Sequence, residues 1–74
     1  MYYDSQKAGQ LIRRLRTERG MSQELLSGLS GIARSHLAMI ESGRKCANVE
    51  TLWRISIALG MRLSEFIHLL EETG

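Results

Sequence analysis

Residues 22–43, SQELLSGLSGIARSHLAMIESG, hold the pattern that decides the fold. Ser22 is a good N-cap, and the leucines that follow it predict a short helix. Gly31 can adopt a positive φ and turn the chain sharply, and a second helix is expected over about 33–42, ending at Gly43. Two short helices joined by a tight turn that contains glycine form a helix-turn-helix motif.

The flanking sequence predicts three more helices. Before the motif, apolar residues recur at the spacing of one helix face, at Ala8, Leu11, Ile12 and Leu15. After it, Asn48 can cap a helix whose core face is Leu52, Ile55, Ser56 and Leu59. A fifth helix is expected from Leu63 or Ser64 to Glu71. The β-branched residues form no alternating run, so we expect residues 1–74 to form one compact all-α domain of five helices.

The composition is that of a small globular protein, with 74 residues of which 43% are hydrophobic. The lone Cys46 excludes an intramolecular disulfide, fits a reducing compartment and has no histidine at ligand spacing, so no metal site is expected. The first ten residues lack the pattern of a signal peptide, and no apolar run reaches membrane-spanning length. No catalytic arrangement is evident. We therefore expect a cytoplasmic protein that is not an enzyme, needs no cofactor and does not bind a membrane.

The charge is unevenly distributed along the chain. Residues 1–20 carry five cationic and two acidic side chains, whereas residues 49–74 carry two cationic and four acidic ones. A basic N-terminal region favours a polyanionic partner. On charge alone, an ordinary solvated surface is an equal alternative.

Taken together, these features resemble the Cro and phage-repressor (XRE) type of helix-turn-helix domain. The resemblance covers about residues 7–70 and rests on four pieces in the right order: LRTERGMSQ, the turn glycine Gly31, IESG and ETLWRISIALG. Within this family, the chain is most similar to the small controller proteins of restriction–modification systems. The resemblance implies a lambda-repressor-like fold of five helices, with helices two and three as the motif.

The resemblance also implies a set of functional residues. It implies that base edges are read from Arg34, Ser35 and Met39, and Ala38 shares their helix face. It implies phosphate contacts from the first helix, the start of the second and the end of the third, at Arg16, Ser22, Gln23, Ser42, Arg44 and Lys45. It further implies a structural ion pair between Arg16 and Glu41. The chain departs from the family at Ala33, which cannot cap the third helix with its side chain, and at Arg62, which suggests that the fifth helix starts later, at Ser64.

The chemistry of these residues suits a DNA groove. Arg34 offers a fork of donors that matches guanine O6 and N7, although a phosphate contact or a solvated arginine is the alternative. Ser35 can donate or accept and specifies little by itself. Ala38 and Met39 can pack on thymine methyl groups, or they merely avoid clashes.

An apolar surplus indicates a homodimer built from the helices of about residues 49–71. Val49, Trp53 and Ile57 repeat every four residues beside the core face. The fifth helix is apolar on more than one face, so the expected interface also includes Phe66, Ile67 and Leu70. The alternative is that Trp53 completes the core of one chain. Two copies on a twofold axis would read a pseudo-palindromic operator.

The sequence thus predicts a homodimeric, DNA-binding transcriptional regulator that acts as a repressor or an activator. Autoregulation and control of a restriction–modification system are the specific roles considered. An antitoxin-type regulator with a toxin partner is the nearest alternative. A protein–protein adaptor that keeps the fold without binding DNA is the alternative from another class.

Overall fold

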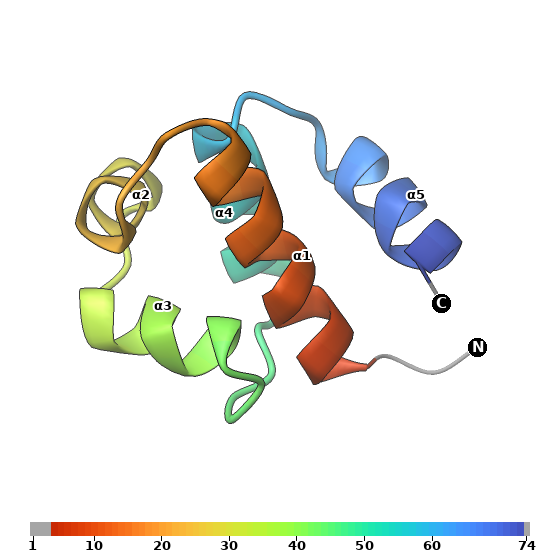
Figure 1. Ribbon diagram of the computed structural model, residues 1–74, viewed down its shortest axis with the longest axis horizontal. Coiled ribbons are helices and arrows are strands. Elements are labelled where there is room, and N and C mark those ends of the chain that lie inside the picture. Colours follow the sequence, from red (N-terminus) through yellow and green to blue (C-terminus); the bar gives the residue numbers. More distant parts are fainter. Residues whose placement is uncertain (1–3, 74) are drawn as a thin grey trace.

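The computed structural model describes residues 4–73, which form five helices and no strand. The helices are α1 (Ser5–Glu18), α2 (Gln23–Ser30), α3 (Arg34–Glu41), α4 (Val49–Ala58) and α5 (Leu63–Thr73). In Figure 1, α1 crosses in front of α4 at the centre, α2 and α3 lie on one side, and α5 lies on the other. The prediction of a five-helix, all-α fold is confirmed.

Local signals set the helix boundaries. The Ser22 hydroxyl accepts the backbone N–H of Leu25 at 3.0 Å, and the Asn48 side chain accepts that of Thr51 at 2.8 Å, so both predicted caps are present. Gly31 ends α2 in the left-handed conformation, with φ +72°, as the sharp turn requires.

The ends of α3 and α5 depend on backbone groups. Ala33 provides no side-chain cap for α3, as predicted, because its methyl group cannot accept a hydrogen bond. The α5 helix begins at Leu63 rather than at Ser64, because the Glu65 carboxylate accepts the backbone N–H of Arg62 at 2.8 Å. This bond is one half of a capping box and removes the need for a capping serine.

The core lies where all five helices meet. It is formed by Ala8, Leu11, Ile12, Leu15, Leu26, Leu37, Ile40, Ala47, Leu52, Ile55, Leu59, Phe66 and Leu70. Four of these come from α1, which packs against both α3 and α5. The helix that carries the predicted reading face is therefore held against the most central element of the fold.

The fifth helix corrects one prediction. Within a single chain, Phe66 is 0% exposed and Leu70 is 8% exposed. The expectation that Phe66 lies in a dimer interface is therefore wrong, and Leu70 has little exposed surface to contribute to one. The reason is that α5 packs against α1 and α4 together, which covers two of its faces. Ile67 is partly buried against the same core.

Candidate nucleic-acid interface

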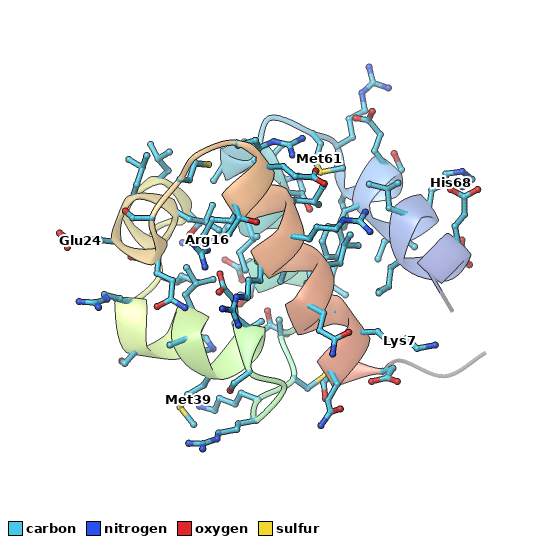
Figure 2. The ribbon with its side chains drawn as sticks, viewed as in Figure 1. Lys7, Arg16, Glu24, Met39, Met61 and His68 are labelled. Atoms are coloured by element: carbon cyan, nitrogen blue, oxygen red, sulfur yellow. The ribbon has the colours of Figure 1, made fainter. Side chains whose placement is uncertain are left out.

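The two faces of α3 differ sharply. Its inner face buries Leu37, Ile40 and Glu41. Its outer face exposes three of the four residues for which base contacts are expected, Arg34, Ser35 and Met39, and the fourth, Ala38, is partly exposed beside them. In Figure 2 the Met39 side chain points away from the rest of the molecule. The outer face of α3 therefore presents an arginine, a hydroxyl and a thioether side by side to solvent.

A buried polar anchor holds α3 in place. Arg16 Nε donates to Glu41 Oε2 at 2.8 Å, and Arg16 Nη2 donates to Glu41 Oε1 at 3.0 Å. The two side chains are 11% and 3% exposed, respectively. Gln23 Nε2 also donates to Glu41 Oε1, at 3.0 Å, so the carboxylate joins α1, α2 and α3. A charge-assisted, two-pronged pair of this kind fixes geometry as well as contributing energy.

The anchor limits what Arg16 and Gln23 can offer to a phosphate. Arg16 Nη1 donates to the carbonyl of Met21 at 2.8 Å, so each nitrogen of the guanidinium already has an internal acceptor. Gln23 retains one amide hydrogen besides the one given to Glu41. Figure 2 shows Arg16 directed between α2 and α3 rather than outward. Both side chains therefore act mainly inside the fold.

The expected serine contacts are arranged differently at the two ends of the motif. Ser22 accepts the Leu25 N–H, so its own hydroxyl hydrogen remains available to an external acceptor. Ser42 instead donates its hydroxyl hydrogen to the carbonyl of Met39 at 3.1 Å. A phosphate contact by Ser42 would require that bond to break.

A short basic loop follows α3. The backbone N–H groups of Arg44 and Lys45 both donate to the carbonyl of Met39, at 3.0 and 3.2 Å, which ties the loop to the last turn of the helix. Both side chains are exposed, and within residues 4–73 neither forms an ion pair or side-chain hydrogen bond. Two uncompensated cations thus flank the outer face of α3.

Two residues that matter for this geometry escaped the sequence analysis. Gly9 lies buried on α1, where it meets the backbone of the last residues of α3. Arg19 follows the end of α1 and donates from Nε to the carbonyl of Leu59 at 2.7 Å, which links the ends of α1 and α4. A cation near a helix C-terminus is favourable in general, but the sequence does not say which helix end it meets.

The outer face of α4 is apolar. Val49, Trp53 and Ile57 are 71%, 53% and 56% exposed. Trp53 therefore does not complete the core of one chain, which removes that alternative. Three large apolar side chains on one exposed stripe are unusual for a small protein that has no partner.

Other kinds of site are not evident in the part of the chain that the structure describes. None of the helices within residues 4–73 combines the length and the apolar character of a transmembrane span. Among the same residues, no cluster of three or more His, Cys, Asp or Glu side chains could hold a metal ion.

The fold and its exposed α3 define a helix-turn-helix DNA-binding protein, and comparison with known proteins extends this conclusion. Residues 12–66 match the helix-turn-helix family model, and the chain belongs to that family, in its XRE-type branch. A curated relative, the uncharacterized HTH-type transcriptional regulator y4dJ of Sinorhizobium fredii, is 35% identical over 65 residues, covering 88% of this chain and 84% of the relative. The chain is accordingly a helix-turn-helix transcriptional regulator.

Solved structures give the same result. The restriction–modification controller protein C.AhdI from Aeromonas hydrophila is 37% identical, with a TM-score of 0.82 over 88% of this chain and 98% of that one. The controller protein C.Esp1396I, solved as a tetramer in complex with its natural 35 base-pair operator, is 25% identical, with a TM-score of 0.87 over 97% and 95% of the two chains. The similarity to controller proteins predicted from the sequence is confirmed.

Proposed function

We propose that this regulator acts as a homodimer that reads a pseudo-palindromic operator with α3. The observation that carries the proposal is the outer face of α3, which exposes Arg34, Ser35 and Met39 while Glu41 on its inner face is locked to Arg16. A helix of this size fits the major groove, where base edges differ in their donors and acceptors. A rigid mount for such a helix supports base reading more than a loose electrostatic contact.

Within this proposal, each side chain of the outer face makes the contact that its chemistry allows. Arg34 donates two hydrogen bonds to the O6 and N7 atoms of a guanine, a contact worth about 1–3 kcal/mol of discrimination. Met39 and the partly exposed Ala38 pack against thymine methyl groups, and Ser35 takes a donor or acceptor on a neighbouring base. The close grouping of these four residues on one short helix supports a contact with a few adjacent base pairs.

Phosphate contacts would fix the register of α3 in the groove. Arg44 and Lys45 are the strongest candidates, because both are exposed and carry no internal partner among the described residues. Ser22 and the free N–H groups of the first turn of α2 form a second phosphate site at the other end of the motif. Arg16, Gln23 and Ser42 contribute less, since their donors are largely engaged inside the chain.

The homodimer would form through α4. Its exposed stripe of Val49, Trp53 and Ile57 supplies an aromatic anchor flanked by aliphatic side chains, and the partly buried Ile67 of α5 would add to the interface. Two reading helices on a twofold axis would contact half-sites about one helical turn apart. The C.Esp1396I–operator complex supports an oligomer on DNA for this chain as well.

We further propose an autoregulatory role, as a controller of a restriction–modification system. The similarity to two controller proteins along nearly the whole chain supports it. An operator that lies upstream of the regulator's own gene would make the protein's concentration the regulatory signal.

One experiment tests the core of the proposal. A random pool of duplexes, each about three helical turns long, is enriched with the protein, and binding to the enriched site and to scrambled DNA is measured by fluorescence anisotropy at several salt concentrations. We expect a preference of at least about a thousandfold and a twofold-symmetric site. Equal, steeply salt-dependent binding to both duplexes would leave only phosphate contacts. Absence of binding to either would favour the adaptor.

A further inference from the structure

Gly9 lies where the backbone of α1 approaches the end of α3 closely. A Cβ atom at this position would overlap the carbonyl oxygen of Ile40 and lie 2.7 Å from the carbonyl oxygen of Glu41. These are backbone atoms at the end of α3, so they cannot move aside as a flexible side chain would. The absence of a side chain at Gly9 is therefore what allows α3 to sit at its observed distance from α1.

Polar contacts join α1 to the end of α3 and its following turn on both sides of Gly9. On the N-terminal side, the Ser5 hydroxyl donates to the carbonyl of Gly43 at 3.4 Å. On the C-terminal side, Arg16 holds the Glu41 carboxylate. Three residues of α1 thus contact the end of α3 and the turn that follows it, and Gly9 lies between the two polar contacts along α1.

We propose that Gly9 is a positioning residue for DNA recognition, an inference that rests on the proposed reading of bases by α3. Hydrogen bonds to base edges require distances near about 2.9 Å and good alignment. Displacement of α3 by a methyl group at Gly9 would disturb those bonds. Contacts from Arg44 and Lys45 to phosphates tolerate the same displacement, because their long side chains can readjust and the attraction is not directional. Gly9 therefore controls the ratio of specific to non-specific binding.

Gly28 provides a matched control. It also lies inside a helix, α2, but a Cβ atom there would meet nothing within 4 Å. Gly28→Ala is expected to raise the melting temperature by about 2–8 °C, because alanine loses less backbone entropy in a helix. The same substitution at Gly9 is expected to lower it. Gly28→Ala can thus offset part of the stability that Gly9→Ala removes.

The test compares the wild type, Gly28→Ala, Gly9→Ala and the double variant Gly9→Ala/Gly28→Ala. Folding is checked by circular dichroism at about 10 °C in about 1 M trimethylamine N-oxide, which favours compact states. Anisotropy titrations under the same conditions use the duplex enriched by the wild type and a scrambled duplex. We expect the specificity ratio of the folded double variant to fall at least about tenfold, which is the discrimination that one good bidentate pair supplies. Gly28→Ala should keep the wild-type ratio.

An unchanged ratio in the folded double variant would overturn the proposal and leave Gly9 with a purely structural role. If the double variant does not fold, Glu41→Gln in the Gly28→Ala background decides the question. It weakens the Arg16 contact that holds the same end of α3 against α1, and it adds no heavy atom. A wild-type ratio in that variant would show that base reading does not depend on how closely α3 is held to α1, and it would overturn the proposal. A wild type with no preferred duplex would remove the proposed function itself, and with it this inference.

Discussion

The helices α3 and α4 have similar inner faces and opposite outer faces. Both bury aliphatic side chains against the same core, Leu37 and Ile40 from α3 and Leu52 and Ile55 from α4. Outside, α3 exposes an arginine, a serine and a methionine and leads into a basic loop, whereas α4 exposes a valine, a tryptophan and an isoleucine. The core therefore fixes the position of a helix, and the outer face determines what kind of partner the helix suits.

The two helices also differ in what anchors them. The inner face of α3 includes Glu41, whose carboxylate is bound by Arg16 and Gln23. The inner face of α4 includes Ser56, whose hydroxyl donates, among residues 4–73, only to the carbonyl of Leu52 in its own helix, at 2.7 Å. A polar anchor between helices is directional and an apolar contact is not. A helix held by a directional anchor, such as α3, suits a partner that is recognised through aligned hydrogen bonds. A helix with an apolar outer face, such as α4, suits a partner that binds by burying apolar surface area.

Removal of the α3 anchor should have the largest effect. Glu41→Ala leaves the Arg16 guanidinium buried without its carboxylate, and we expect the free energy of unfolding to fall by about 3–5 kcal/mol. Urea denaturation followed by circular dichroism measures the decrease. Ser56→Ala on α4 serves as the control, because it removes only a bond within one helix, and it should cost about 1 kcal/mol. Similar decreases for the two variants would contradict the contrast between the anchors.

The caps and the turn of these helices were predictable from sequence because they are local. Ser22 and Asn48 bond to N–H groups three residues away, and Gly31 needs only its own backbone conformation. The ion pair of Arg16 and Glu41 spans 25 residues, and only the family resemblance pointed to it. Of the two expected starts of α5, Leu63 is the observed one, and Ser64 was too late because the acceptor that completes the cap is the Glu65 side chain inside the helix.

Other features could not be predicted because they depend on which elements meet. Helical periodicity placed Phe66 on an apolar face of its helix, but it could not show that α1 and α4 both pack against that helix. Phe66 was therefore assigned to an interface instead of the core. Gly9 has no sequence signal, since a glycine at a close helix crossing and one in open space, such as Gly28, look alike.

The apolar face of α4 should show the next largest effect. Ile57→Asp places a charge in the proposed interface, where it would lose water without gaining a partner, so we expect self-association to weaken at least about a hundredfold. Sedimentation equilibrium measures the dimer constant. Leu29→Asp is a matched control, because Leu29 on α2 is 59% exposed, against 56% for Ile57. A wild type that stays monomeric, or an equal effect of both variants, would rule out this interface.

The outer face of α3 should respond more selectively. Arg34→Ala is expected to weaken binding to the enriched duplex by about 1–3 kcal/mol per half-site and to relax the preference for guanine at one position. Anisotropy titration with single-base variants of the duplex detects both changes. Arg62→Ala, an exposed arginine that precedes α5, should leave affinity and preference unchanged. Retention of the guanine preference without Arg34 would move base reading to another residue.

The basic loop should show the smallest change, and one of a different kind. Lys45→Ala leaves one phosphate per chain without its cation, so binding to enriched and scrambled duplexes should weaken by the same factor. The slope of log K against log salt should become shallower by about 0.9 for each phosphate that is no longer neutralised. Arg34→Ala, measured in the same way, should show the opposite pattern: a large loss of preference for the enriched duplex and little change in the salt slope. If Lys45→Ala altered the base preference instead, the division of α3 into a face that reads bases and a loop that holds phosphates would be wrong.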